Sequence, residues 1–559
     1  MNINVRWKKF QHILKNEGIG RTIYHFKIFF YINILKKDKY YVWQKFIESP
    51  KVHHNIQKYK NKQENKLFCI ILNAKDQSDK LIQKTVDSIL NQPYSKWLLY
   101  IISSSSNFPN KSDSRIKFIS NVENADQIAN AQFDFVSIIN PGDILAPNCL
   151  IEVNNVYTKN INSEILYFDE DEIDSRNIRF HPFFKPDWAF ETLFSTWYIK
   201  SAFFSKQLFI NCSAWNGDEY NYLKNLINNP NINAEHIPKI LLHRSKVNFN
   251  RNNFKNAINK YANNIVTEDG LTKYSLQYSY KVAKDYLVSI IIPTHNALPT
   301  LRRCLESIVK KTTYKNYEII IVQHNTTQPE VSQYINHFFK IHSGKSIQIN
   351  EEFNFSNLIN AGAQIASGEH LILLNNDTEL ITPDWIQNLL SFSQLKDIGA
   401  VGCLLQYPDK KIQHAGVVVG LKNCAEHPYK GFGLEATFNM DLPLIIHNSS
   451  AVTAACLMIK KTLFDEVNGF DKSLAVAYND VDFCLKLLEK GYRNIYTPFV
   501  KLIHYESLTR GDDTVDTQKQ QRVNSEILYF QKKWSKYIEH DPYYNPNLSK
   551  EFLDCSVKL

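Results

Sequence analysis

The sequence of 559 residues lacks the cysteine arrangements of zinc-binding and disulfide-rich proteins. Its nine cysteines form no C-x-x-C pair and leave an odd count, which argues against a zinc ribbon and against a complete disulfide framework. A reducing cytoplasm is therefore the simplest location to expect.

Long apolar runs are absent as well. No stretch approaches the roughly eighteen uninterrupted apolar residues that a membrane-spanning helix needs, and the N-terminus has no signal-peptide layout. We therefore expect no transmembrane span. Residues 23–35 (IYHFKIFFYINIL) are apolar but too short to span a bilayer. They are either a peripheral amphipathic anchor at the inner face of the cytoplasmic membrane or a helix packed on the first domain.

The sequence has no strong excess of one charge. A net charge of +9 is modest for this length, and basic residues are scattered beside acidic ones, so no nucleic-acid surface is indicated. With 44% hydrophobic residues the protein is globular, and its length predicts about two to four domains.

An internal repeat is the main organising feature of the sequence. Each copy has a hydrophobic strand, a helix and a second strand, in residues 68–73, 86–89 and 94–102 of the first copy and 288–293, 305–308 and 314–322 of the second. Each copy then continues to a hydrophobic strand that ends in a polar turn, in residues 135–143 and 369–380. Alternating strands and helices predict an α/β fold of two tandem, mostly parallel sheets that are covered on both faces.

These features divide the chain into five parts. We expect a basic and aromatic helical extension, a first α/β domain, a structured linker, a second α/β domain, and a C-terminal helix and tail, in residues 1–66, 67–246, 247–286, 287–511 and 512–559. Within the last three parts, the pattern predicts a helix at 254–265, a strand at 274–282 and a helix at 518–537.

The strongest candidate for chemistry is Asp377, which follows the buried strand of the second copy. Open parallel sheets bind ligands beyond the carboxyl ends of their strands, and a carboxylate there suits a divalent cation that carries a diphosphate. Its neighbours Asn375 and Asn376 offer amide groups to a ribose or phosphate. Taken alone, this cluster is more often an ordinary Asn/Asp turn.

A second acidic cluster, Asn479-Asp480-Val481-Asp482, stands at the start of a predicted helix. A carboxylate held by helix-terminal N–H groups can accept a proton from a hydroxyl that is forming a bond, although helix capping alone also explains Asp480. Asp482 could orient a sugar hydroxyl or face solvent.

His504 follows the predicted strand at 496–503 and can reach the same edge of the sheet. A single histidine is more often structural. However, one aspartate cannot hold a divalent cation, and an imidazole is a plausible second protein ligand beside diphosphate oxygens. Residues 413–416 and 448–456 are small or polar and could line a pocket or form tight turns.

The span 287–511 closely resembles the catalytic domain of family 2 glycosyltransferases, which are inverting enzymes of the GT-A fold. The resemblance rests on SIIIPT at 289–294, FNFS at 353–356, NAG at 360–362, NNDTE at 375–379, NDVDFCL at 479–485 and His504. The tail DPYYNPN at 541–547 is similar to the end of bacterial, rhamnosyltransferase-like members that build O-antigen and capsule. The resemblance thus implies two tandem GT-A-like, Rossmann-like domains.

The resemblance also implies roles for individual residues. Asp480 would be the general base, and Asp377 and His504 would bind Mg²⁺ or Mn²⁺. The nucleotide-sugar site would comprise Pro293, Thr294, His295, Gln323, Asn325, Asn354, Asn357, Asn375 and Asn376, and the acceptor site Thr453, Asn479 and Asp482. The implied partners are a nucleotide-diphosphate sugar donor and a glycan or lipid-linked glycan acceptor. Family members usually carry Asp where this chain has Gln323, so nucleotide preference is left open.

The first copy resembles the same family through residues 167–173 and 182–188, but its site is degenerate. Gly142 stands at the metal position, and Ser103–Ser106 replace the nucleotide turn, while Asp143 and Asp218 remain. Because a diphosphate leaving group without a cation loses charge stabilisation, we expect the first domain to be inactive and to serve as a scaffold or acceptor-binding module.

Three rival functions stay open at this point. The first is a bifunctional enzyme with both domains active, and the second is a non-catalytic glycan- or nucleotide-binding protein. The third is a nucleotidyltransferase, which would be expected to have a Gly-rich, Lys/Arg-containing phosphate loop after the first strand. Residues 294–297 (THNA) contain no such loop.

Overall fold

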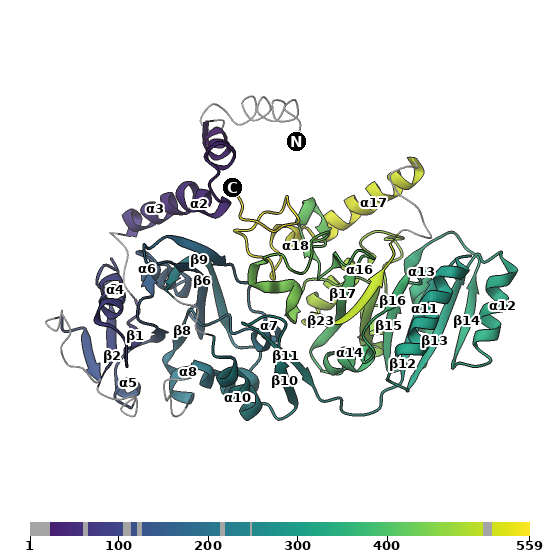
Figure 1. Cartoon of the computed structure of the whole chain (residues 1–559), viewed down its shortest axis with the longest axis horizontal. Coiled ribbons are helices and arrows are strands. Elements are labelled where there is room, and N and C mark those ends of the chain that lie inside the picture. The colour runs from purple at the N-terminus through teal and green to yellow at the C-terminus, as the bar shows by residue number, and fades with distance from the viewer. Residues whose placement is uncertain are drawn as a thin grey trace.

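Two α/β domains lie side by side in the computed structural model, with helical segments of both chain ends beside them (Figure 1). The structure describes residues 23–59, 65–103, 113–119, 126–212, 219–245, 249–506 and 517–559. Asp218 and Ser104–Ser106 of the predicted first site lie outside these residues.

The first domain is built on a nine-stranded sheet. Its strand order is β3-β2-β1-β4-β8-β6-β9-β5, and β7 pairs with β6. The strands are β1 (Phe68–Asn73), β2 (Trp97–Ile102), β3 (Ile116–Ile119), β4 (Phe135–Ile139), β5 (Ile144–Leu145), β6 (Ile165–Ile173), β7 (Arg179–Phe183), β8 (Ala202–Ser205) and β9 (Ala234–Arg244).

The second domain repeats the strand order of this sheet and adds one strand, β21, to make ten. Its order is β14-β13-β12-β15-β22-β17-β23-β16, with β18 pairing with β17 and β21 with β23. The strands are β12 (Val288–Thr294), β13 (Tyr317–His324), β14 (Gly344–Ile349), β15 (His370–Leu374), β16 (Thr378–Leu380), β17 (Ile398–Gln406), β18 (Ile412–His414), β21 (His447–Asn448), β22 (Cys456–Lys460) and β23 (Arg493–His504). The predicted fold of two tandem α/β domains is confirmed.

Both sheets combine parallel and antiparallel pairs in the same places. The pairs β1–β2, β1–β4 and β6–β9 are parallel, while β8 runs antiparallel to β4 and β6. In the second sheet β12–β13, β12–β15 and β17–β23 are parallel, and β22 is antiparallel to its neighbours β15 and β17. The repeat seen in the sequence is therefore a repeat of topology.

Helices cover the sheets because each presents an apolar face to them. In α11 (Leu298–Lys311) the buried residues include Leu301, Cys304, Leu305 and Ile308, at spacings of three and four. The other helices of the two domains are α4 (Asp79–Leu90), α5 (Asp126–Asn130), α6 (Cys149–Tyr157), α7 (Phe190–Ser195), α8 (Lys206–Asn211), α9 (Leu223–Asn228), α12 (Pro329–Phe338), α13 (Phe355–Ile365), α14 (Trp385–Ser393), α15 (Lys461–Glu466) and α16 (Asn479–Glu489). All residues of β12 are buried, as expected for a central strand between two helical layers.

The segment between the domains holds α10 (Arg251–Tyr261) and a two-stranded antiparallel sheet of β10 (Ile265–Asp269) and β11 (Leu276–Tyr280). The helix predicted at 254–265 extends four residues beyond the C-terminal end of α10, and the sequence analysis did not predict β10. The short run Ile-Val-Thr-Glu-Asp of β10 carries two charges in five residues, which conceals its strand character.

Both chain ends pack on the first domain through one strand. Three consecutive carboxylates of β6, at positions 169–171, are buried. Asp169 accepts hydrogen bonds from Asn545 in the C-terminal tail, and Asp171 accepts one from the Tyr40 hydroxyl at 2.5 Å. The acidic motif of the first domain therefore holds together the two ends of the chain.

The N-terminal extension contains η1 (Phe30–Ile34), α2 (Lys39–Trp43), η2 (Gln44–Glu48) and α3 (Ser49–Tyr59), and the C-terminal one α17 (Thr517–Lys533) and α18 (Ser535–Glu539). Two short strands, β19 (Val418–Val419) and β20 (Ala425–Glu426), form a separate hairpin. Across the described ranges, each helix is too short or too polar to cross a bilayer.

Candidate active site

Asp377 and His504 meet at the edge of the second sheet. Asp377 lies between β15 and β16, and His504 is the last residue of β23, where it pairs with Thr378. The His504 Nε2 lies 3.1 Å from the Asp377 Oδ1, and both side chains are less than a tenth exposed. The Tyr505 backbone N–H donates to the Asp377 carbonyl at 3.0 Å, which fixes the turn. The structure thus brings together the two predicted metal ligands.

Asp480 stands in the first turn of α16 and is partly exposed. Its Oδ2 accepts from the Ala454 backbone N–H at 3.0 Å, and its Oδ1 accepts from the Val481 N–H at 2.9 Å. Two backbone donors therefore fix the orientation of the predicted base.

One short loop connects Asp480 to the Asp377 turn. Ala454 donates to Asp480, and the carbonyl of the next residue, Ala455, accepts from the Asn375 N–H at 3.1 Å. Asn375 lies two residues before Asp377. The predicted base and the predicted metal ligands consequently lie at the same edge of the sheet, on either side of residues 453–455.

The backbone just before Asp480 is in an unusual conformation. Tyr478 has a φ of +61°, in the left-handed region that bulky residues rarely adopt. Glu526 of α17 stabilises the segment just before Tyr478. Its carboxylate accepts hydrogen bonds from three successive backbone N–H groups, those of Ala475, Val476 and Ala477, at 2.8 to 3.2 Å. Sequence reasoning missed Glu526, which resembles any other charge on a polar helix.

The nucleotide-side residues form a second cluster along the ends of β12 and β13. Asn376 donates to the Thr294 hydroxyl at 3.0 Å, which joins this cluster to the Asp377 turn. The His295 Nδ1 lies 2.7 Å from the His324 carbonyl, and Asn325 donates to the Glu351 carbonyl at 3.0 Å. Pro293 lies next to Thr294 in β12. This cluster and the metal ligands share one edge of the sheet.

Two other predicted nucleotide ligands, Gln323 and Asn354, have side-chain contacts with the protein itself, and a third, Asn357, does not for its side-chain oxygen among the described residues. Gln323 accepts from Ser332 at 3.4 Å, so α12 occupies its amide oxygen. Asn354 caps α13 by accepting from the Asn357 N–H and donates to the Lys472 carbonyl. The Asn357 side-chain oxygen is buried and has no partner in the part of the chain that the structure describes.

Of the three predicted acceptor residues, Thr453 and Asn479 lie next to Asp480, and Asp482 points elsewhere. Thr453 belongs to the loop beside Asp480, and Asn479 is buried and accepts from the Asp480 N–H at 2.8 Å. Asp482 is fully buried; it accepts from Trp534 at 2.8 Å and pairs with Lys533 at 2.6 Å. Its carboxylate therefore contacts the C-terminal helix and is closed to a glycan in this structure.

A pair of histidines lies near His504 and Asp480, and the sequence pointed only to His414, as part of the possible pocket lining at 413–416. The His414 Nδ1 is 2.8 Å from the His427 Nδ1, so one ring must donate and the other must accept as a neutral imidazole. Burial lowers the pKa of His414 well below its usual range, and the nearby His427, His447 and His504 lower it further. Burial also lowers the pKa of His427, while Glu426 and Asp480 raise it. The pair thus lies in the electrostatic field of both His504 and Asp480.

The donor set at Asp377 fits a divalent cation in part. No cluster of three or more His, Cys, Asp or Glu side chains suited to a metal occurs among the described residues. Asp377 and His504 supply one oxygen and one nitrogen that converge on one point, a mixture that Mn²⁺ and Mg²⁺ tolerate when other oxygens complete the sphere. The His504 Nδ1 is buried and unpartnered within the described ranges. Two converging protein ligands fit a cation that a diphosphate shares.

The first domain has different chemistry at the corresponding positions. Leu145 pairs with Leu242 as Leu380 pairs with Leu502. Gly142 lies three residues before Leu145, as Asp377 lies three residues before Leu380. Arg244 lies two residues after Leu242, as His504 lies two residues after Leu502.

Neither position of the first domain suits a cation. Gly142 has a φ of +94°, and a Cβ there would meet the Ser245 hydroxyl at 2.6 Å, so an aspartate would be strained. Arg244 forms an ion pair with Glu170 at 2.9 Å. In the first domain, Arg244 with its permanent positive charge thus takes the place of His504, and Gly142 takes the place of the Asp377 carboxylate.

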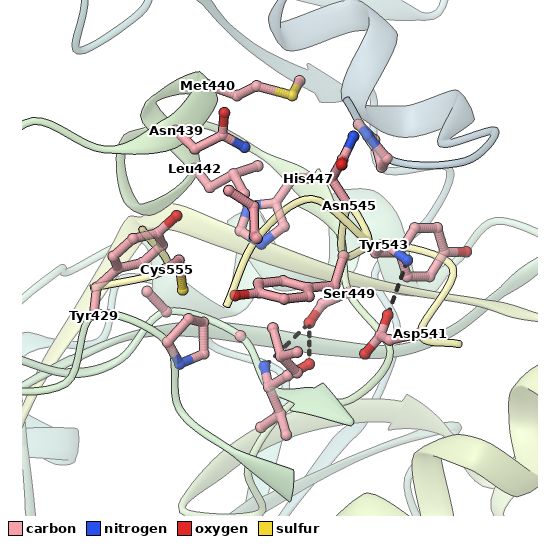
Figure 2. Close-up of a pocket in the computed structure, with 18 of the residues that line it drawn as sticks. Tyr429, Asn439, Met440, Leu442, His447, Ser449, Asp541, Tyr543, Asn545 and Cys555 are labelled. Atoms are coloured by element: carbon pink, nitrogen blue, oxygen red, sulfur yellow. Dashed lines mark hydrogen bonds between the residues drawn. The ribbon is translucent and has the colours of Figure 1, made fainter. Parts of the chain in front are cut away.

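A separate cavity lies where the two domains meet the C-terminal tail (Figure 2). Its lining includes Tyr429, Asn439, His447, Asp541 and Tyr543, and neither Asp377 nor Asp480 belongs to it. Aromatic rings and amides suit a sugar, but a volume of about 30 Å³ has room for about one water. The cavity is therefore a feature of the domain junction.

Comparison with known proteins identifies a protein family that matches part of the second domain. Residues 289–417 match the model of glycosyl transferase family 2, so the second domain carries a domain of that family. The matched segment includes Asp377 and ends before Asp480 and His504. The prediction of a family 2 glycosyltransferase domain is confirmed.

Two relatives extend over most of the chain. It is 31% identical to uncharacterized protein y4gI of Sinorhizobium fredii and 27% identical to O-antigen biosynthesis protein RfbC of Myxococcus xanthus, each over 88% of this chain. The chain spans only 58% and 41% of the lengths of these two relatives.

Among solved structures, that of GalNAc-T7 with UDP, GalNAc and Mn²⁺ aligns with this chain over 50% of this chain's length and 62% of the length of GalNAc-T7. The TM-score is 0.36 and the identity 16%. A score this low establishes no shared fold, so the fold assignment rests on the strand order and the family match.

Proposed function

We propose that this chain, with a family 2 glycosyltransferase domain in its second half, transfers a sugar from a nucleotide-diphosphate donor to a bacterial surface glycan such as O-antigen or capsule. One observation carries the proposal. Residues 454–455 bond to Asp480 on one side and to Asn375, beside Asp377, on the other. This arrangement supports the proposal, because an inverting transfer needs a proton acceptor and cation ligands at one edge, and Asp480, Asp377 and His504 would supply them.

In the proposed reaction Asp480 is the general base. Its carboxylate takes the proton of the acceptor hydroxyl as that oxygen attacks the anomeric carbon. The bond from the anomeric carbon to the diphosphate oxygen breaks on the opposite side, so the configuration inverts. The backbone N–H groups of Ala454 and Val481 hold the carboxylate in place throughout.

Asp377 and His504 would hold Mg²⁺ or Mn²⁺, which when bound supplies positive charge to the departing diphosphate. Thr294 and Asn376 stand beside these ligands and would orient the donor. Because the side chain of Gln323 already contacts Ser332, we propose that the base of the nucleotide is held mainly by other groups of the cluster.

The first domain acts as a scaffold in this proposal. Gly142 and Arg244 at its corresponding positions give no ligand for a cation, which disfavours the bifunctional alternative. The joint presence of Asp377, His504 and Asp480 in the second domain disfavours a purely binding protein. We propose that the reaction takes place in the cytoplasm, with a glycan or lipid-linked glycan as acceptor.

Donor binding tests the proposal most directly. Purified protein is heated with each of a panel of nucleotide-diphosphate sugars, with and without Mn²⁺ or Mg²⁺. The cognate donor should raise the unfolding temperature only when the cation is present, with about 2.7 kcal/mol of stabilisation at a hundredfold excess over Kd.

Asp377→Asn should abolish this protection and the metal-dependent release of nucleoside diphosphate. Asp143→Asn is the matched control, because Asp143 is a buried aspartate at the same edge of the first sheet. It should behave as wild type. Protection that survives Asp377→Asn and disappears in Asp143→Asn would assign the donor to the first domain and overturn the proposal.

A further inference from the structure

The helix at the N-terminal end of the described chain has two apolar faces. One face packs on the protein: Tyr24 and Tyr31 both contact the Phe46 ring edge-to-face, at 6.4 and 5.1 Å between ring centroids, and Ile28 is buried. These residues follow each other at spacings of four and three, as one side of a helix requires.

The opposite face is apolar and uncovered. Ile23, Phe26, Phe30 and Ile34, at spacings of three, four and four, are 51%, 58%, 39% and 58% exposed. We call these four residues the outer face. The other side of this helix is already packed on the protein. An exposed apolar face of this kind indicates a surface that binds a membrane or another molecule.

Positive charge accompanies the outer face. Residues 1–37 contain eight Lys or Arg and one Glu, so they carry +7 of the net charge of +9. Lys27, Lys36 and Lys37 are exposed, and residues 23–37 contain no acidic residue. The other 522 residues together carry only +2, so most of the net positive charge lies in this N-terminal segment.

The helix is firmly attached to the body of the protein. Behind it, Tyr40 bonds to Asp171, and Arg179 pairs with Glu48 at 2.6 Å, so α2 and η2 are anchored on the first domain. In Figure 1 this N-terminal segment stands at the outer edge of the molecule, away from both sheets. The outer face therefore projects from a rigid support.

We propose that the outer face docks on an anionic lipid bilayer. Apolar side chains flanked by lysines match the acyl boundary and the headgroups of such a surface. Twelve residues at about 1.5 Å each reach roughly 18 Å, which is too short to span, so the helix lies in the plane of the interface. The proposal corresponds to the first of the two alternatives that the sequence left for residues 23–35, and it does not depend on the proposed activity.

Vesicle co-sedimentation of the full chain tests the proposal. Wild-type protein should bind vesicles of phosphatidylcholine mixed with phosphatidylglycerol, bind phosphatidylcholine alone more weakly, and dissociate as salt is raised. Phe26→Ser/Phe30→Ser/Ile34→Ser should weaken binding at least about tenfold. Lys27→Gln/Lys36→Gln/Lys37→Gln should weaken it roughly a hundredfold at low salt, and only on the anionic vesicles.

The matched control replaces three equally exposed apolar residues elsewhere, as Ile161→Ser/Leu271→Ser/Ile341→Ser. It should bind like wild type, and all variants should keep the wild-type unfolding temperature. Wild-type protein that fails to bind anionic vesicles overturns the proposal. So does light scattering that shows a dimer of wild type and a monomer of the outer-face variant, because a second copy would then cover the face.

Discussion

Arg493 and Glu191 form a bidentate ion pair across the two domains. The Arg493 Nη2 lies 2.8 Å from Glu191 Oε1, and its Nε lies 3.0 Å from both carboxylate oxygens. Asn448 of the second domain adds a bond to Glu191 at 2.6 Å and accepts from the first N–H groups of α7. These charged contacts, which are buried on the Glu191 side, attach the second domain to the first.

This pair should contribute strongly to stability. Glu191→Gln leaves the part-buried Arg493 guanidinium without its counter-charge, which should cost about 3 kcal/mol and lower the unfolding midpoint in denaturant. The control Glu306→Gln removes the partner of Lys310 in an exposed pair on α11 and should leave the midpoint unchanged. Equal effects of the two substitutions would mean that the domains are held together by other contacts.

Asp480→Asn should reduce sugar transfer by about 10²- to 10⁴-fold, the usual contribution of a general base. The amide keeps an acceptor for the Ala454 N–H, so the loop and donor binding should be retained. Turnover with the cognate donor measures the first effect, and thermal protection by that donor measures the second. Asp465→Asn, on the exposed side of α15, is the control. A variant at position 480 with near wild-type turnover would exclude this residue as the base.

The hydrophobic strands were predictable because burial on both faces is visible in composition. β12 and β15 are nearly continuous apolar runs, and the end of β15 gave the position of Asp377. The repeat placed the same elements in the first domain. The α/β fold and the meeting of Asp377 with His504 followed from these two signals.

Side-chain direction was harder to predict. Residues two apart on a helix point about 200° apart. Asp480 bonds to the loop at the edge of the sheet, and Asp482 consequently faces the end of α17, where Lys533 and the next residue, Trp534, enclose it. Glu526 was missed for a related reason, since its partners at 475–477 lie about fifty residues away in the sequence.

Glu526 should act on the reaction through the loop that it holds. Glu526→Gln replaces one carboxylate oxygen with an N–H₂ group, so at least one of the three backbone donors loses its acceptor. We expect kcat to fall about tenfold, while donor protection stays unchanged, because the strained backbone at Tyr478 loses support next to Asp480. Glu539→Gln, an exposed glutamate of α18, is the control. A loss of donor binding with unchanged kcat would contradict this role.

His370 should make the protein sensitive to mild acid. It lies at the start of β15, far along the strand from the Asp377 end, with Nδ1 2.9 Å from the Ser393 hydroxyl. Burial, together with the positive charge of the nearby Lys460, lowers the pKa of His370 to about 4. A histidine whose pKa is lower in the folded than in the unfolded state contributes stability above about pH 6.5, and this contribution is lost as the pH falls toward 4.

His370→Gln removes this titration. The free energy of unfolding of wild type relative to the variant should therefore decline by about 3 kcal/mol between pH 6.5 and 4, since one pKa unit corresponds to 1.36 kcal/mol. Urea unfolding at a series of pH values measures the difference directly, and the variant cancels the contribution of all other titrating groups. A difference that is flat over this range would mean that the imidazole takes up a proton as readily in the folded protein as in the unfolded chain.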